Sequence, residues 1–250
     1  MPATLPKFLL VTPVWNDSVR LEHFGVKLAK ALAVSGLNLT WVIADDGSDT
    51  EEVVQLERLK EKFSQIYSDV LLHLHPERSF KGGAIYQSWQ QFPDVDYYAF
   101  VDADGAVSAP ELMRMLNCAS DSENLDMSFV AVRHFSGSLT VDRSLLRKAT
   151  FHFFRILVRG IVGLKSMDTQ CGAKVISGRS YRAVSERLVE DGFVFDVELL
   201  TTLEQGAWPI TELPIMWQEI PGSKLRLWRD LWFMTGGLMR IRRRLNTSDL

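Results

Sequence analysis

The first 130 residues alternate between short, mostly apolar runs and longer segments in which apolar residues recur at helical spacing. In residues 19–34, for example, Leu21, Phe24 and Leu28 would share one face of a helix. The whole pattern predicts strands at 8–12, 41–44, 70–74, 97–101 and 128–132, with helices at 19–34, 51–67 and 84–92. Continuously apolar strands between helices indicate an α/β fold with a mostly parallel sheet covered on both faces.

The second half of the chain is less regular. Its pattern predicts a long basic helix at 143–164, a strand at 173–176, a helix at 196–205, a strand at 210–215 and a basic amphipathic tail after residue 224. No internal repeat and no low-complexity segment interrupts the sequence.

Composition and charge narrow the classes of protein. The 250 residues are 46% hydrophobic and 24% charged, which argues against intrinsic disorder. The net charge of −3 argues against nucleic-acid binding, because phosphate contacts require a basic surplus. Two cysteines are too few for a disulfide framework, so a cytoplasmic location is predicted. We expect neither a signal peptide nor a membrane span, since no apolar stretch reaches roughly 20 residues.

Polar residues follow the ends of the predicted strands. They are Pro13, Trp15, Asn16 and Asp17 after the first strand, Asp45 and Asp46 after the second, Asp102, Ala103 and Asp104 after the fourth, and Arg133 after the fifth. Ligands of parallel sheets bind beyond the carboxyl ends of the strands, so these residues predict one site. The chain has neither a G-x-G-x-x-G segment nor a P-loop, so a dinucleotide site and a P-loop site are not predicted.

Asp102 and Asp104 are predicted to hold a divalent cation. Two close carboxylates repel each other unless a cation neutralises them. Paired oxygen ligands, completed by phosphate oxygens and water, suit Mg²⁺ or Mn²⁺. The alternative is a simple turn, because Asp104 followed by Gly105 is also good turn chemistry.

Two further polar segments have both a structural and a functional interpretation. The end of segment 45–49 would cap the next helix, which leaves Asp45 and Asp46 to accept bonds from a base or a ribose. After the third strand, Lys81 precedes two glycines that let the backbone approach a ligand, and the helix N-terminus behind them favours anions. The alternative for this second segment is an ordinary loop before a helix.

Together, segments 13–17, 45–48, 81–84 and 102–104 resemble the motifs of family 2 glycosyltransferases of the GT-A fold. Segments 168–174 (DTQCGAK) and 192–200 (GFVFDVELL) are similar to the subgroup that transfers sugar to polyprenyl phosphates, and the D-T-Q-C-G form is most similar to dolichyl-phosphate glucose synthases. The resemblance implies a nucleotide-sugar donor such as UDP-glucose, Mg²⁺ or Mn²⁺, and a polyprenyl-phosphate acceptor at the cytosolic membrane face.

The resemblance covers about residues 8–225 and implies a division of the chain. A GT-A domain at 1–224 would comprise a nucleotide-sugar-binding half (8–132) and an acceptor half (133–224), followed by a tail at 225–250. The chain departs from the resembled enzymes in three respects. It shows no transmembrane helix, it has Trp15 where Tyr is common, and it has Ala173 at a position that is often aromatic.

The resemblance also implies roles for individual residues. The donor would be bound by Pro13, Trp15, Asn16, Asp17, Asp45, Asp46, Lys81, Gly82, Asp102, Ala103 and Asp104. The acceptor would be bound by Arg133, Arg143, Arg147, Asp168 and Gln170. The catalytic residues would be Asp104, Arg133, Asp196 and Lys224, and the metal ligands Asp102 and Asp104.

The chemistry depends on the acceptor. The metal and Lys224 would stabilise the diphosphate leaving group. An anionic phosphate needs orientation by arginines more than deprotonation, and direct displacement would invert the anomeric centre. A sugar or lipid hydroxyl would instead need a base, for which Asp196 is the candidate; the alternative for Asp196 is a helix N-cap. A binding protein without turnover is the third interpretation.

Two basic amphipathic segments indicate contact with an anionic membrane surface. Residues 143–165 combine basic residues with an apolar stripe, and residues 225–244 combine two tryptophans with an arginine cluster at 240–244. We therefore expect peripheral association with the membrane. The alternative is core packing with a solvated basic face, which accounts well for residues 143–165 taken alone, whereas the tail favours the membrane. The sequence leaves open a homo-oligomer or an integral membrane partner.

Overall fold

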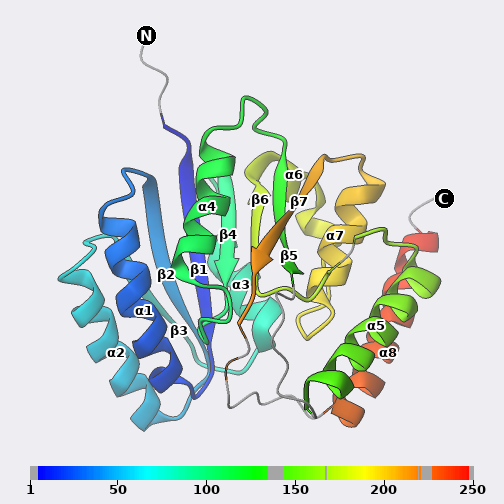
Figure 1. Ribbon diagram of the computed structural model, residues 1–250, viewed down its shortest axis with the longest axis horizontal. Coiled ribbons are helices and arrows are strands. Elements are labelled where there is room, and N and C mark those ends of the chain that lie inside the picture. Colours follow the sequence, from blue (N-terminus) through cyan, green and yellow to red (C-terminus); the bar gives the residue numbers. More distant parts are fainter. Residues whose placement is uncertain (1–4, 135–142, 167, 219, 221–226, 248–250) are drawn as a thin grey trace.

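The computed structural model describes residues 5–134, 143–166, 168–218, 220 and 227–247. Seven strands form one sheet in the order β3-β2-β1-β4-β6-β5-β7 (Figure 1). The strands are β1 (Lys7–Val14), β2 (Asn38–Asp46), β3 (Val70–His75), β4 (Tyr97–Val101), β5 (Ser128–His134), β6 (Ala173–Ser177) and β7 (Ile210–Met216). β6 runs antiparallel to β4 and β5, and every other neighbouring pair is parallel. The predicted α/β fold with a mostly parallel sheet is confirmed.

Helices cover both faces of the sheet (Figure 1). One face carries α1 (Ser18–Ala33), α2 (Thr50–Ser64) and α4 (Ala109–Ser120). The hydrophobic cluster of the other face includes residues of α3 (Phe80–Gln90), α5 (Arg143–Val162), α6 (Gly178–Val184), α7 (Phe195–Gln205) and α8 (Leu227–Thr247). A short 3₁₀ turn (Ser185–Arg187) precedes α7. Helices α5 and α8 lie side by side.

The central strand β1 shows why the strand sequences are continuously apolar. Phe8 and Leu10 belong to the hydrophobic cluster on the first face, whereas Leu9 and Val11 belong to the cluster on the second. All four are fully buried. Successive side chains of a strand point to opposite faces, so a strand covered on both sides needs apolar residues at every position.

The helices differ from the prediction in ways that bear on the site. α4 was not predicted, although Ser108 caps it by accepting a bond from the backbone N–H of Glu111. α3 begins at Phe80 rather than at residue 84. α7 begins at Phe195 with Val194 in the N-cap position, so the alternative interpretation of Asp196 as an N-cap is wrong.

The C-terminal helix α8 is part of this core. Leu238, Ile241 and Leu245 are buried in the hydrophobic cluster of the second face. Any surface role of α8 is therefore confined to its remaining sides. Among the described residues, no helix combines the length and apolar character that crossing a bilayer requires.

Candidate active site

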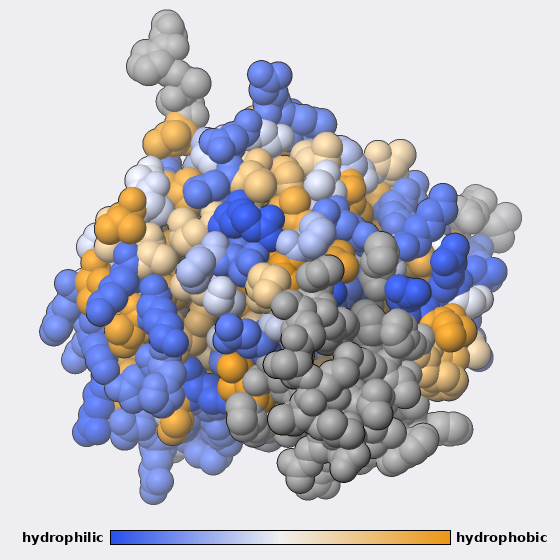
Figure 2. Space-filling view, viewed as in Figure 1, coloured by the Kyte–Doolittle hydropathy of each residue, from blue (hydrophilic) through white to orange (hydrophobic). Residues whose placement is uncertain are grey.

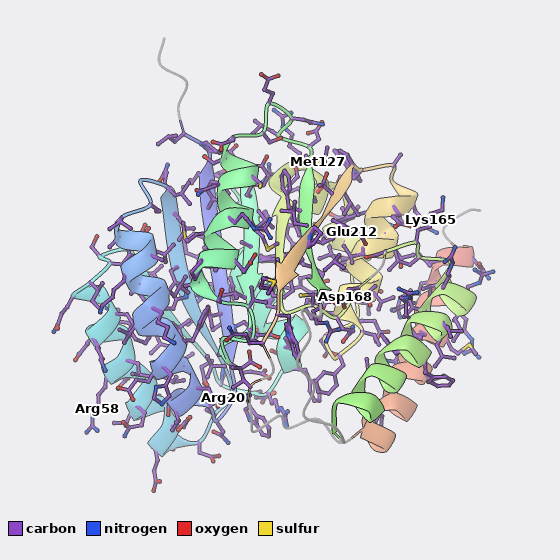
Figure 3. The ribbon with its side chains drawn as sticks, in the orientation of Figure 1. Arg20, Arg58, Met127, Lys165, Asp168 and Glu212 are labelled. Carbon is purple, nitrogen blue, oxygen red and sulfur yellow. The ribbon has the colours of Figure 1, made fainter. Side chains whose placement is uncertain are left out.

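The predicted site residues gather at the carboxyl edge of the sheet. β1 pairs in parallel with both β2 and β4, so Val14, Asp45 and the residues that follow Val101 lie at the same edge. Figure 3 shows Arg20 at the start of α1 and Asp168 near the end of β5, both toward this edge. The topology thus brings the acids of three strand ends into one region.

Asp102 is held between α3 and the segment before β6. Its Oδ1 pairs with Lys81 Nζ at 2.6 Å, and its backbone N–H donates to the Gly172 carbonyl at 2.9 Å. A Cβ on residue 172 would lie 2.4 Å from Asp102 Oδ2, so any larger residue here would displace the Asp102 carboxylate. The glycine of the DTQCG segment therefore makes room for the Asp102 carboxylate.

Asp104 lies in a turn two residues further on. Its Oδ1 accepts the backbone N–H of Ala106 at 2.9 Å, and Gly105 has φ +75°, so the turn interpretation is also correct. Arg20 Nη1 lies 3.6 Å from Asp104 Oδ2. Burial and the neighbouring Asp102 carboxylate raise the pKa of Asp104 above its ordinary value. Asp104 is thus a turn residue whose carboxylate still favours a nearby cation.

The carboxylates of Asp102 and Asp104 have the ligand chemistry that Mg²⁺ or Mn²⁺ prefers, and a metal held by them stays a prediction. Their side chains are 33% and 28% exposed, so an ion can reach them. The described part of the chain has no group of three or more His, Cys, Asp or Glu side chains suited to a metal. Oxygen ligands from outside the protein, such as phosphates, would therefore have to complete the coordination shell.

Asp196 forms a buried ion pair. Lys174 is fully buried on β6, and its Nζ lies 2.6 Å from Asp196 Oδ1. The same ammonium donates to the carbonyls of Thr169 at 2.9 Å and Cys171 at 3.1 Å. Burial raises the pKa of Asp196, although Lys174 and Lys81 oppose this effect. Asp196 thus connects Lys174 electrostatically to Lys81, which is itself paired with Asp102.

Lys81 is the cation at the centre of this arrangement. Burial works against its charged form, but Asp102 and Asp196 raise the pKa of Lys81 above the ordinary value. Its Nζ also lies 5.0 Å from the ring centroid of Phe100 and 5.6 Å from that of Phe195. The ammonium is therefore charged at neutral pH and lies against the Asp102 carboxylate.

Arg133 is engaged by Asp168. Arg133 Nε and Nη2 donate to the two carboxylate oxygens of Asp168 at 2.6 Å and 2.8 Å, and the backbone N–H of Arg133 donates at 3.2 Å. The Asp168 side chain is only 1% exposed. Both residues were predicted to bind the acceptor, and the structure first gives them a structural role, since the arginine neutralises a buried carboxylate.

The loops after β1 and β2 are joined by hydrogen bonds. Asn16 has φ +47°, its backbone N–H donates to Ser48 Oγ at 2.8 Å, and its side chain exchanges two bonds with Asp49. The Asp45 carboxylate accepts the backbone N–H of Ser48. Asp17 pairs with Arg20. These predicted donor residues therefore also organise the rim of the site.

Asp46 and Trp15 lie close to an arginine that the sequence did not single out. Asp46 Oδ1 accepts the backbone N–H of Ser79 at 2.6 Å, and Asp46 Oδ2 lies 3.8 Å from Arg78 Nε. The Arg78 guanidinium lies 3.4 Å from the centroid of the Trp15 ring and 5.0 Å from that of Phe80. Arg78 thus connects the β1 loop to the start of α3.

Gly82 packs against the start of α7 and the residues before it. Its N–H donates to the Asp191 carbonyl at 2.7 Å, and a Cβ on residue 82 would lie 2.5 Å from Phe195 Cβ. The glycine therefore permits α3 to approach the start of α7. A direct contact between Gly82 and the donor stays a prediction.

Of the remaining predicted site residues, some are described by the structure and others are not. Gln170 Nε2 donates to the Phe193 carbonyl at 3.0 Å. Pro13 lies in β1 opposite Ala44, and Ala103 is buried. Lys224 and the side chains of Arg143 and Arg147 lie outside the described part of the structure.

Arg20, Arg78 and the role of Lys174 were not predicted from the sequence. Arg20 could have been found, because an Asp–Arg pair at i, i+3 in the first turn of a helix is a local signal. The pairing of Lys174 with Asp196 joins β6 to α7, and no local pattern encodes it.

Solved structures with similar folds are glycosyltransferases. Glucosyl-3-phosphoglycerate synthase from Mycobacterium tuberculosis, in complex with Mn²⁺, UDP and phosphoglyceric acid, superposes with a TM-score of 0.65 at 16% identity, over 94% of this chain and 77% of that one. A mannosyltransferase from Pyrobaculum calidifontis, in complex with GDP-Man and Mn²⁺, gives a TM-score of 0.58 at 13% identity, over 94% of this chain and 62% of that one. The fold is the GT-A glycosyltransferase fold, as predicted.

Proteins of similar sequence show to which family of glycosyltransferases the chain belongs. The dolichyl-phosphate β-glucosyltransferase of Dictyostelium discoideum is 30% identical over 93% of this chain and 73% of its own length. The enzyme of that name from Saccharomyces cerevisiae is 31% identical over 80% of this chain. The aligned part spans 63% of that yeast relative. No family model matches the chain. The chain belongs to the dolichyl-phosphate β-glucosyltransferase family.

Proposed function

We propose that this protein transfers glucose from UDP-glucose to a polyprenyl phosphate such as dolichyl phosphate, with inversion at the anomeric carbon. The observation that carries the proposal is the Asp102–Asp104 pair, flanked by Lys81 and Arg20 at the carboxyl edge of the sheet. The names of the relatives support the acceptor and the sugar. UDP in a structural neighbour of the same fold supports the donor.

In this proposal Asp102 and Asp104 hold Mg²⁺ or Mn²⁺. The ion would supply positive charge against the diphosphate that leaves from the donor. Lys81 places a second positive charge beside Asp102, and Lys224 is proposed to act on the same phosphates. Residues 8–132 would thus hold the donor and residues 133–224 the acceptor.

The nucleoside would bind where the loops after β1 and β2 meet. Asn16 and Asp49 join these loops through two hydrogen bonds. Trp15, which stacks on Arg78, and the Asp45 and Asp46 carboxylates are proposed to contact the base or ribose. Asp45 and Asp46 are 1% and 4% exposed and accept backbone N–H groups of Ser48 and Ser79, so only their remaining oxygen lone pairs would serve this contact. Pro13, which lies in β1 opposite Ala44, is proposed to border the nucleotide on the β1 side.

The phosphate acceptor needs no general base. Asp196 is 2% exposed and paired with a buried lysine, so its geometry suits a positioning role through Lys174 and Lys81. Arg133, with its backbone and side chain fixed by Asp168, is proposed to orient the acceptor phosphate together with Arg143, Arg147 and residue 170. A hydroxyl acceptor would require Asp196 as a base, and its ion pair with Lys174 argues against that alternative.

The outer sides of α5 and α8 are proposed to contact an anionic membrane surface on the cytosolic side. Large apolar side chains are exposed there: Phe153 and Ile156 on α5, and Phe233 and Met239 on α8. Arg155 and Arg159 lie on the same α5 helix. Figure 2 shows apolar and charged surfaces side by side over these helices, at the right of the view. Exposed apolar residues beside cations are typical of interfacial helices.

A donor screen tests the proposal. Thermal unfolding is measured with UDP-glucose, UDP-galactose or GDP-mannose in the presence of Mn²⁺. A ligand at 100 times its Kd should add about 2.7 kcal/mol to the free energy of unfolding. We expect UDP-glucose to stabilise the wild type and the control Asp94→Asn, but Asp104→Asn much less. Stabilisation by GDP-mannose and not by UDP-glucose would contradict the proposed donor.

A further inference from the structure

Residues 188–194, here called the α7 loop, contact the candidate active site on one side. The Asp191 carbonyl accepts the backbone N–H groups of Gly82 at 2.7 Å and Gly83 at 3.2 Å. The first N–H groups of a helix have no partner within the helix, so Asp191 supplies one to the first turn of α3. That turn carries Lys81, and the α7 loop leads directly into Asp196.

Two arginines of α8 bind the same loop from its other side. Arg240 donates to both carboxylate oxygens of Glu190, from Nε at 3.0 Å and from Nη2 at 2.6 Å. Arg244 Nη2 bridges Glu190 at 2.7 Å and Glu198 at 2.6 Å. The side chains of Glu190 and Glu198 are only 5% and 3% exposed. Two buried carboxylates are thus neutralised by the C-terminal helix.

Glu198 links this network back to the loop. Its Oε2 accepts the backbone N–H groups of Val189 at 2.8 Å and Glu190 at 2.6 Å. At the other end of the loop, Gln170 Nε2 donates to the Phe193 carbonyl. The loop is therefore fixed by groups from α3, α7, α8 and the segment before β6.

Close packing of α8 adds an independent observation. A Cβ on residue 237 would lie 2.5 Å from Val194 Cγ2. Gly237 therefore lets α8 lie directly against the residue that precedes α7. A methyl group there would push α8 or Val194 aside.

We propose that Arg240 and Arg244 are positioning residues of the candidate active site. They fix the α7 loop, and through it the first turn of α3 with Lys81 and the start of α7 with Asp196. The basic pattern of the tail predicts that these two arginines face a membrane surface, but both are instead bonded to buried glutamates. The catalytic part of this inference rests on the proposed function, whereas its structural part does not.

Amide hydrogen exchange at Gly82 and Gly83 tests the structural part without any substrate. The perturbing variants are Arg240→Gln, which leaves Arg244 beside Glu190, and Gly237→Ala, which changes no charge. Arg242→Gln, an exposed arginine of the same helix, is the matched control. We expect at least tenfold faster exchange at these two amides in both perturbing variants. Exchange in α1 should not change, and neither should exchange anywhere in Arg242→Gln.

Unchanged exchange at Gly82 and Gly83 in folded Arg240→Gln and Gly237→Ala would overturn the proposal. An equal acceleration in α1 and α3 would also overturn it, because that result would show only a general loss of stability. Should Arg240→Gln fail to fold, Arg240→Lys, which keeps the charge but loses the paired bonds, takes its place.

Turnover tests the catalytic part. Glucosyl transfer by Gly237→Ala should show a kcat at least tenfold lower, with the KM for polyprenyl phosphate within twofold of the wild type. A raised KM with unchanged kcat would contradict positioning of Lys81 and Asp196. An absence of transfer by the wild type would refute the proposed function, and the exchange result would still decide the structural part.

Discussion

Replacing Lys174 with methionine removes the charge that balances Asp196. Lys174 is fully buried, its Nζ lies 2.6 Å from Asp196 Oδ1, and it donates to two backbone carbonyls. Methionine fills a similar volume without charge or donor. The variant therefore leaves a buried carboxylate and two carbonyl oxygens without their partner, while changing the packing little.

The expected loss in the free energy of unfolding follows from the burial of the Lys174–Asp196 pair. Breaking a buried ion pair by removing one partner costs about 3–5 kcal/mol. Lys81 also interacts with Asp196, so we expect a value near the lower end, about 3 kcal/mol. Changing both partners, in Lys174→Met with Asp196→Asn, removes the unpaired charge and should recover most of the loss. Lys27→Met, at an exposed position on α1, is the control and should stay within about 0.5 kcal/mol of wild type.

The assay is urea unfolding followed by tryptophan fluorescence between pH 4 and 8. Burial raises the pKa of Asp196 in the folded state above its ordinary value of 3.8, so its ionisation opposes folding. The penalty is complete above the folded-state pKa and disappears as the pH falls toward 3.8. The stability lost in Lys174→Met should therefore shrink with falling pH. A loss below about 1 kcal/mol, or one of equal size at every pH, would refute the reasoning.

Three further predictions concern the site and the surface. Asp104→Asn should fold normally by circular dichroism and lower kcat by on the order of 10²-fold or more; near-normal turnover across a Mn²⁺ titration would rule out the metal assignment. Arg133→Ala should lower the free energy of unfolding by about 3–5 kcal/mol in urea, because its carboxylate partner is buried. Unchanged stability with a raised KM for the acceptor would show a purely substrate-binding role. Ile156→Glu and Phe233→Glu should weaken sedimentation with anionic vesicles, whereas Val34→Glu, an exposed apolar position on the far side of the fold, should not. Equal sedimentation of all three variants would exclude α5 and α8 as the contact.

The strands could be predicted because the burial of a strand is visible in its own residues. Each central strand lies between two helical layers, so its residues are apolar without interruption, as in Tyr97–Val101. α4 was missed, although Ser108 followed by Pro110 and Glu111 is a helix-start signal. The start of α3 could not be placed, because Phe80 adopts φ +58° and its turn depends on the distant Asp191 carbonyl.

The acids of the site could be predicted from their positions after strands, but their partners could not. Asp102 and Asp104 were found in this way, whereas their cations Lys81 and Arg20 come from two different helices. The arginines of α8 show the same limit. Their basic, amphipathic pattern is the same whether they face lipid or buried glutamates, and only the tertiary structure distinguishes the two.

Transfer of labelled glucose to lipid tests the central claim most directly. Radiolabelled UDP-glucose and Mn²⁺ are added to the protein with dolichyl phosphate in anionic vesicles, with Asp104→Asn and the exposed-site control Asp94→Asn in parallel. The account predicts that wild type and Asp94→Asn move label into the organic phase, that mild acid releases it as glucose, and that Asp104→Asn does so at least about 10²-fold more slowly. UDP release without label in the organic phase, or a labelled lipid that resists mild acid, would contradict transfer to a polyprenyl phosphate.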